Sequence, residues 1–165
     1  MSEAFRHSSP GKSAANLVYP LPTLEATAEL AKLIAQHVQP PLTIALVGTL
    51  GAGKTQWVRY LAGELGVAAE SVTSPTYVLQ QTYAGQFRIH HFDFYRLASA
   101  AQVWDLGIDE LYEQRCLVII EWADKFPECL PQDYLRVTLS QAEDEARTAT
   151  LSAYGPCSHG LLQRL

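Results

Sequence analysis

A glycine-rich segment in the first third of the chain has the residue types and spacing of a phosphate-binding loop. Residues 43–55 read TIALVGTLGAGKT, and Gly48, Gly53, Lys54 and Thr55 fit the pattern Gly-x-x-x-x-Gly-Lys-Thr. Glycines permit the tight turn and the close backbone approach that such a loop requires. Successive N–H groups can then surround an anion at the positive end of a helix dipole. Lys54 would contact the β- and γ-phosphates of a nucleotide, and the Thr55 hydroxyl would bind Mg²⁺.

A second chemical signal is an acid that follows an apolar run. Four apolar residues at 117–120 precede Glu121, which suits a buried strand of a parallel sheet with a carboxylate at its carboxyl end. Ligands of open α/β sheets bind at this edge. Glu121 is therefore the candidate Walker B carboxylate and would bind Mg²⁺ directly or through water. The alternative is a solvated acid at the end of a strand.

Residues 90–96, HHFDFYR, combine a histidine with an acid on one face of a predicted strand. Alternation places His91, Asp93 and Tyr95 on the same face. A neighbouring His and Asp could orient a water molecule for attack. A structural hydrogen bond between His91 and Asp93 is the alternative. A zinc site would need further ligands at suitable spacing, and the sequence offers none.

Two residues near these motifs are further candidates. Thr76 lies in the segment Ser74-Pro75-Thr76-Tyr77, which follows the first helix after the glycine-rich loop. In nucleotide hydrolases a Thr in such a loop can sense the γ-phosphate and Mg²⁺, whereas an ordinary proline turn is the alternative. Trp122 directly follows Glu121 and is expected near the nucleotide or on an exposed rim, with a core position as the alternative.

These side chains require a sheet that brings separate strand ends together. Apolar residues at 44–47 and 117–120 predict two buried strands, and residues 54–65 predict the helix after the loop. Alternating segments at 77–83 and 86–94, joined by Ala84-Gly85, predict an antiparallel hairpin. Further predicted elements are helices at 23–38, 97–104 and 108–114 and strands at 135–139 and 148–153. The order predicts an α/β protein with a three-layer fold like that of P-loop NTPases, its central sheet mostly parallel with an added antiparallel hairpin.

Composition limits the remaining possibilities. The 165 residues suffice for one domain, predicted at 21–165, after a flexible tail at 1–20 that is poor in large apolar residues. A net charge of −5 argues against tight unaided binding to nucleic acid. Three cysteines without a CxxC motif suggest a reducing, cytoplasmic environment. We expect no membrane span and no secretory signal, because no apolar stretch approaches about 18 residues and the N-terminus has no apolar region.

Together, the motifs resemble those of the TsaE family, also called YjeE. The matching segments are Gly48 to Thr55, Ser74 to Tyr77, the His91-Phe92-Asp93-x-Tyr95-Arg96-Leu97 run and Glu121-Trp122, in that order. The resemblance covers residues 21–154. It implies a small bacterial ATPase that acts with the TsaD and TsaB proteins in making threonylcarbamoyladenosine (t6A), the modified nucleoside beside the anticodon of tRNA. In that family TsaD performs the transfer, whereas ATP binding and hydrolysis by TsaE reset or drive the TsaD–TsaB complex. The resemblance thus implies that tRNA is met through the complex.

The resemblance also implies roles for individual residues, with ATP and Mg²⁺ as cofactors. Residues expected to contact the nucleotide are Thr49, Leu50, Gly51, Ala52, Gly53, Lys54, Thr55 and Gln56. Gln56 stands where the family often has a second Thr. Mg²⁺ would be held by Thr55 and Glu121. The expected catalytic residues are Lys54, Thr76, Asp93 and Glu121, with Thr76 and Asp93 near the γ-phosphate.

Two other functions fit a phosphate-binding loop. A small-molecule kinase would be expected to carry an arginine-rich lid, but Arg88, Arg96 and Arg115 are scattered. A nucleotide-gated interaction module with little turnover is the other alternative, and it differs little from a slow ATPase subunit. A GTPase is disfavoured because the chain has no Asn-Lys-x-Asp motif.

Overall fold

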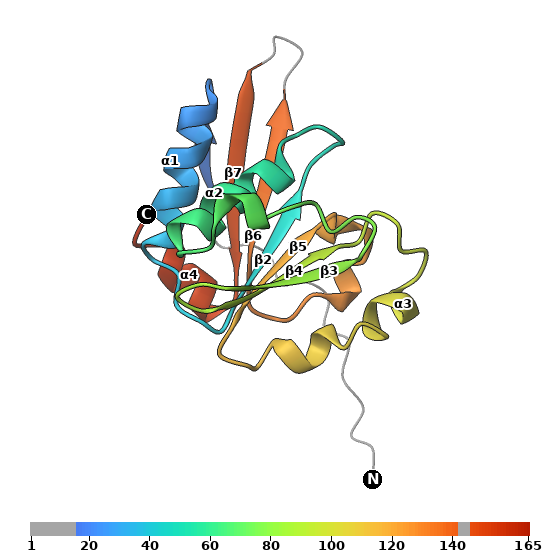
Figure 1. Ribbon diagram of the computed structural model, residues 1–165. Coiled ribbons are helices and arrows are strands. Elements are labelled where there is room, and N and C mark those ends of the chain that lie inside the picture. Colours follow the sequence, from blue (N-terminus) through green and yellow to red (C-terminus); the bar gives the residue numbers. More distant parts are fainter. Residues whose placement is uncertain (1–15, 142–145) are drawn as a thin grey trace.

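Strand β2 (Leu42–Val47) lies at the centre of a mixed sheet of seven strands (Figure 1). The computed structural model describes residues 16–141 and 146–165. Across the sheet the strand order is β1-β7-β6-β2-β5-β4-β3. The other strands are β1 (Asn16–Pro20), β3 (Gln80–Ala84), β4 (Arg88–Asp93), β5 (Leu117–Glu121), β6 (Tyr134–Gln141) and β7 (Arg147–Tyr154). All of β2 except Val47 is buried, as its apolar sequence predicts.

The four inner strands are parallel, whereas the outer strands are antiparallel to their neighbours. β2 pairs in parallel with β5 and β6, and β4 pairs in parallel with β5. β7 is antiparallel to β6 and β1, and β3 is antiparallel to β4. The predicted parallel centre and hairpin are confirmed, but a mostly parallel sheet is wrong, since three of the six pairings are antiparallel. The connection between β6 and β7 is too short for the crossover that parallel pairing requires.

The last five residues of the predicted flexible tail form a strand. Residues 16–20 form β1, which pairs with β7 from Asn16 opposite Ser152 to Pro20 opposite Thr148. Leu17 and Tyr19 alternate with more exposed residues and pack against the core. This alternating pattern is short and follows a polar, serine-rich segment. The strand was therefore not predicted from the sequence. The rest of the predicted tail, residues 1–15, lies outside the described residues.

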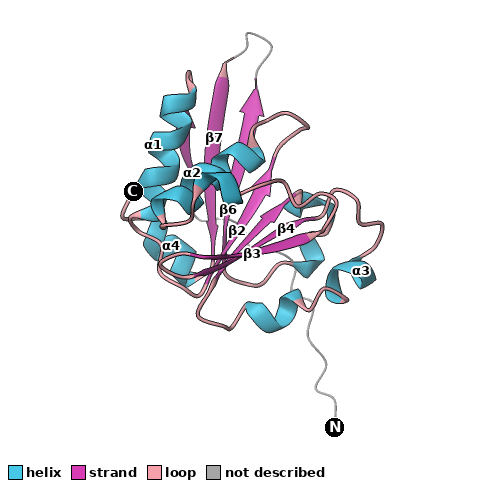
Figure 2. Cartoon of the chain, in the orientation of Figure 1, coloured by secondary structure: helices cyan, strands magenta, loops and turns pink. Residues whose placement is uncertain are grey.

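Helices cover both faces of the sheet (Figure 2). In the part of the chain that the structure describes, the α-helices are α1 (Leu24–Ala35), α2 (Lys54–Glu64), α3 (Ala100–Trp104) and α4 (Pro156–Leu162). Helices α1, α2 and α4 share one core with Ile44 and Leu46 of β2. Ala45, between them, joins a second core with α3 on the opposite face. Successive side chains of β2 point to opposite faces of the sheet, so this one strand contributes to both cores.

Helix boundaries follow local signals in most places. The Thr23 side chain accepts a hydrogen bond from the Ala26 N–H at 3.2 Å and so caps the N-terminus of α1. The predicted helix at 97–104 is shorter in the structure, because Ser99 caps the start of α3. At 108–114 the structure has a 3₁₀ turn, Ile108–Leu111, in place of an α-helix. Within the described residues, every helix is too short or too polar to cross a membrane.

Candidate nucleotide-binding site

The loop between β2 and α2 contains glycines at positions that disfavour a side chain, for steric reasons at Gly48 and for conformational reasons at Gly53. A Cβ atom on Gly48 would lie 2.7 Å from the carbonyl oxygen of Leu139 in β6. Gly53 has φ 95° and is the cap residue directly before α2. This left-handed conformation favours glycine. The loop therefore passes close to β6 and presents its backbone at the N-terminus of α2, as the motif predicts.

A hollow of about 280 Å³ opens beside this loop. Its lining includes all four residues predicted to be catalytic, Lys54, Thr76, Asp93 and Glu121. It also includes six of the eight residues predicted to contact the nucleotide, the exceptions being Thr49 and Ala52. The topology explains this, because the loop, β4 and β5 all reach the same edge of the sheet at their carboxyl ends.

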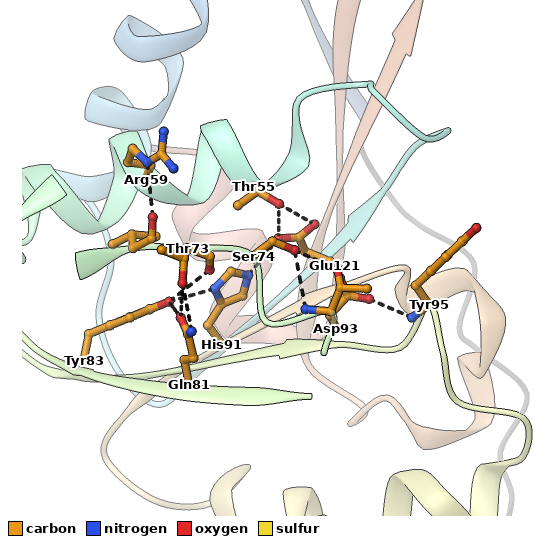
Figure 3. Close-up of polar contacts among 12 residues, drawn as sticks. Thr55, Arg59, Thr73, Ser74, Gln81, Tyr83, His91, Asp93, Tyr95 and Glu121 are labelled. Carbon is orange, nitrogen blue, oxygen red and sulfur yellow. Dashed lines mark hydrogen bonds and ion pairs between the residues drawn. The ribbon is translucent and has the colours of Figure 1, made fainter. Parts of the chain in front are cut away.

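The side chains of Thr55 and Glu121 meet at the floor of the site. The Thr55 hydroxyl lies 2.8 Å from Glu121 Oε1 and 3.1 Å from Oε2 (Figure 3). Glu121 is the last residue of β5 and is opposite Leu46 of β2. With 3% of its surface exposed, it is not the solvated acid of the alternative interpretation. A hydroxyl and a carboxylate are hard oxygen ligands of the kind that Mg²⁺ prefers.

Lys54 is held against the loop by carbonyl oxygens. Its Nζ donates hydrogen bonds to the carbonyls of Gly48 at 2.6 Å and Thr49 at 2.9 Å. It also lies 3.9 Å from the ring centroid of Trp122. Trp122 lines the hollow, which is the position near the expected nucleotide that the sequence suggested for it. Burial lowers the pKa of Lys54, and the nearby carboxylates of Glu121 and Asp93 partly offset this effect. Thr49 does not line the hollow, but its carbonyl oxygen accepts a hydrogen bond from Lys54, which does.

Asp93 is fixed by two hydrogen bonds from separate segments. Thr76 Oγ1 donates to Asp93 Oδ2 at 2.6 Å, and the Tyr95 N–H donates to Oδ1 at 2.7 Å. Ser74 Oγ lies 2.7 Å from Thr76 Oγ1. Asp93 is 1% exposed and lies directly opposite Glu121. The loop before β3 is thereby attached to the same pair of strand ends that carries the acids.

His91 contacts a different acid from the one that alternation suggested. Its Nε2 lies 2.9 Å from Glu121 Oε1, so a pairing with Asp93 is wrong. The pairing of β4 with β5 places His91 opposite Ile119, and Glu121 is then its diagonal neighbour on the same face. Long side chains can reach such diagonal neighbours, whereas His91 and Asp93 are separated along one strand.

Sequence reasoning missed the residues behind His91. The Tyr83 hydroxyl lies 3.2 Å from His91 Nδ1 and 2.5 Å from Gln81 Oε1. The Gln81 amide donates to Thr73 Oγ1 at 2.9 Å, so β3 is joined to the loop before it (Figure 3). The predicted hairpin already placed Gln81 and Tyr83 on one face, but their partners depend on strand register, which the sequence does not show.

A second, smaller hollow of about 30 Å³ adjoins the first. The two share Gly53 and Gln56, and Ala52 lines the smaller one. Its other walls come from Leu21, from the first turn of α1 with Leu24 and Thr27, and from strands β6 and β7. The two hollows therefore meet at the start of α2.

The metal ligands available here suit Mg²⁺ only in combination with a substrate. Among residues 16–141 and 146–165, no group of three or more His, Cys, Asp or Glu side chains could hold a metal ion. Mg²⁺ usually keeps several waters and binds through one or two carboxylates plus the phosphates of a substrate. Thr55 and Glu121 fit that partial coordination, and the buried, opposed acids Asp93 and Glu121 would be stabilised by a cation.

The fold and site define an α/β protein with a glycine-rich loop before a helix and an acid at a neighbouring strand end. The family model described as "Threonylcarbamoyl adenosine biosynthesis protein TsaE" matches residues 21–149. The chain is 36% identical over 132 residues to the "tRNA threonylcarbamoyladenosine biosynthesis protein TsaE" of Bacillus subtilis, covering 79% of this chain and 82% of that one. A protein of the same name from Treponema pallidum is 32% identical over 126 residues, covering 76% and 93%.

A solved structure agrees with these sequence relationships. The crystal structure of Bacillus subtilis YdiB superimposes with a TM-score of 0.75 at 29% identity, covering 90% of this chain and 93% of that one. The chain therefore belongs to the TsaE family, and the resemblance noted in its motifs is confirmed.

Proposed function

We propose that this chain is a Mg²⁺-dependent ATPase of the P-loop NTPase type that serves t6A modification of tRNA. The observation that carries the proposal is the contact of the Thr55 hydroxyl with the Glu121 carboxylate, at 2.8 Å, inside the hollow beside the glycine-rich loop. A loop hydroxyl and a strand-end acid that meet in this way supply the protein ligands of a Mg²⁺–nucleotide complex.

The residues of the hollow have different roles in the proposed reaction. The loop N–H groups bind phosphate at the N-terminus of α2. Lys54 exchanges its two carbonyl partners for phosphate oxygens and stabilises the charge that develops there. Asp93 orients a water molecule, and Thr76 holds Asp93 in place through its 2.6 Å hydrogen bond. Bound Mg²⁺ polarises the phosphoryl oxygens and neutralises their charge.

The composition of the hollow favours hydrolysis over transfer to a second substrate. Among the described residues that line it, Lys54 is the one cation and there is no arginine. Kinases clamp the transferred phosphoryl group and its acceptor with additional positive charge.

Family membership supports the biological role that we propose. The relatives named above are called tRNA threonylcarbamoyladenosine biosynthesis proteins. We assign this chain to the same process as an ATPase subunit that acts with TsaD and TsaB and does not perform the transfer itself. The net charge of −5 is consistent with contact to tRNA through these partners. This role places the protein in the cytoplasm, where tRNA is modified.

Phosphate release from ATP tests the proposal most directly. The purified protein should release phosphate slowly alone and faster with the TsaD–TsaB pair, in a Mg²⁺-dependent manner, and Lys54→Ala serves as the blank. A rate of phosphate release that the TsaD–TsaB pair does not change, together with phosphate transfer to a small hydroxyl compound, would support the kinase alternative. Mg²⁺-dependent nucleotide binding with no release in either condition would support the interaction module.

A further inference from the structure

His91 lies at the centre of a buried row of polar side chains behind the candidate metal site. Its side chain is 0% exposed and does not line the hollow. Nε2 lies 2.9 Å from Glu121 Oε1, and Nδ1 lies 3.2 Å from the Tyr83 hydroxyl (Figure 3). Both ring nitrogens are therefore used, one toward the site and one away from it.

The chemistry of the partners assigns the proton positions. An ionised carboxylate can only accept hydrogen bonds, so His91 donates from Nε2 to Glu121. The Tyr83 hydroxyl lies within hydrogen-bond distance of both His91 Nδ1 and Gln81 Oε1, so it holds the imidazole ring from the side away from Glu121.

These contacts treat the two oxygens of Glu121 differently. Oε1 accepts from His91 at 2.9 Å and from Thr55 at 2.8 Å, whereas Oε2 has the longer 3.1 Å contact with Thr55. Oε1 is thus held from the interior of the protein and from the loop at once. Oε2 retains capacity to bind a further partner at the edge of the hollow, which Glu121 lines.

We propose that His91, held by Tyr83, is a positioning residue that orients the Glu121 carboxylate for the metal ion. The proposal rests on the proposed function, because it assumes that Mg²⁺ and a nucleotide occupy the hollow. His91 acts through Glu121 and does not itself line the hollow. Without its N–H group, a buried carboxylate would lose a hydrogen bond and turn away from the metal position. Hydrogen bonds to ligating carboxylates have this orienting effect in metal sites.

The neighbouring His90 provides a matched control. It is also nearly buried, at 8% exposure, but alternation places it on the opposite face of β4. There its Nδ1 lies 3.2 Å from Thr82 Oγ1 and 3.3 Å from Gln80 Nε2. Leucine at position 90 or 91 therefore removes the same kind of side chain from adjacent buried positions, and only the change at 91 removes a partner of Glu121.

The experiment measures binding of a fluorescent ADP analogue to the full chain, with Mg²⁺ titrated from EDTA upward. His91→Leu is expected to raise the Mg²⁺ concentration for half-maximal effect about tenfold. Metal-free ADP affinity should stay within about twofold, because the phosphate loop is untouched. His91→Gln retains an N–H donor and should recover part of the loss, and His90→Leu should match the wild type. ¹⁵N NMR should show the His91 Nε2 signal shifting with Mg²⁺–ADP while the His90 signals do not.

The outcomes separate this proposal from the proposed function. Mg²⁺-dependent ADP binding by the wild type that is unchanged in folded His91→Leu overturns the role of His91 alone. If the wild type binds no ADP, or binds ADP equally well with and without Mg²⁺, both the proposed function and the role of His91 are overturned. If circular dichroism shows His91→Leu unfolded, Tyr83→Phe takes its place and removes one hydroxyl. It should raise the Mg²⁺ requirement about threefold, the effect of one neutral hydrogen bond, and no change overturns the proposal.

Discussion

Asp93 and Glu121 lie directly opposite each other at the carboxyl ends of the parallel strands β4 and β5. Both are buried, and each accepts a hydrogen bond from a different threonine, Thr76 for Asp93 and Thr55 for Glu121. Like charges on directly opposed residues repel each other. Lys54 attracts both carboxylates, but one cation does not balance two anions. The site is therefore arranged at some cost in stability that a bound cation would reduce.

Asn at position 93 should separate stability from activity. Asp93→Asn keeps an oxygen for the Tyr95 N–H and offers an NH₂ group to Thr76, while it removes the repulsion with Glu121. We expect the free energy of unfolding without nucleotide to rise by up to about 1 kcal/mol. ATP hydrolysis should fall about 100-fold, because the water loses its orienting acid. Urea unfolding in EDTA and phosphate release measure the two effects. A clear loss of stability would contradict the repulsion argument.

Truncating Glu121 should affect the metal more than the nucleotide. Glu121→Ala removes the carboxylate that contacts Thr55 and leaves the phosphate loop intact. We expect the Mg²⁺ concentration required for ADP binding to rise at least about tenfold, and metal-free ADP affinity to change less. Calorimetric titration at several Mg²⁺ concentrations provides the comparison. An equal loss of both affinities in a folded variant would argue against a metal ligand at this position.

Lys54 should be indispensable for hydrolysis. Its ammonium group is the cation of the hollow and lies beside the loop that would hold the phosphates. Lys54→Ala is expected to lower phosphate release by about 100-fold or more, as removal of a charge-stabilising group typically does. Lys32→Ala, an exposed lysine in the last turn of α1, is the control and should be within about twofold of wild type. A normal rate in Lys54→Ala would refute the assignment of the site.

Local motifs predicted the loop and the two strand ends of the site. The Gly-x-x-x-x-Gly-Lys-Thr spacing is contained in eight consecutive residues, so its geometry depends little on the rest of the fold. Glu121 could be predicted because an acid after a fully apolar run marks the end of a buried strand. Both features are encoded by neighbours in sequence, and the structure places them together in one hollow.

Other features depend on pairing between distant segments. Whether His91 reaches Asp93 or Glu121 depends on the register of β4 against β5. The alternation of residues along β4 shows which of them share a face, but it does not show this register. The strand at residues 16–20 exists because β7 offers it an open edge from the other end of the chain. Neither the partner nor the register leaves a mark in the local sequence, so these two features could not be predicted.

Tyr112 should make the protein sensitive to alkaline pH. Its hydroxyl donates to the Cys129 carbonyl at 2.7 Å, and burial raises its pKa above the ordinary value of about 10. Above pH 10 the unfolded chain releases this proton and the folded chain keeps it, so stability falls as pH rises, by at most about 1.4 kcal/mol per pH unit. Tyr112→Phe should cost about 1 kcal/mol at pH 7. Urea unfolding should show this difference shrinking above pH 10, and a constant difference would contradict the pKa argument.

Two glycines at opposite ends of the same loop–helix unit should respond in opposite directions to alanine. At Gly48 a Cβ atom would meet the Leu139 carbonyl at 2.7 Å and the Ala52 Cβ at 3.0 Å, both parts of a packed structure. The loop must then move away from β6. At Gly63, in the last turn of α2, a Cβ atom would meet nothing within 4 Å.

Gly48→Ala is therefore expected to lower the free energy of unfolding by about 1–3 kcal/mol, the usual effect of inserting a methyl group into packed surroundings. It should also weaken ADP binding, because the displaced loop carries the phosphate-binding N–H groups. Gly63→Ala should raise stability by about 0.5 kcal/mol, since alanine loses less backbone freedom than glycine in a helix, and ADP affinity should not change. Thermal or urea unfolding and ADP titration of the two variants give the comparison. If Gly48→Ala bound ADP as the wild type does, close packing of the loop against β6 could not be a requirement of the site.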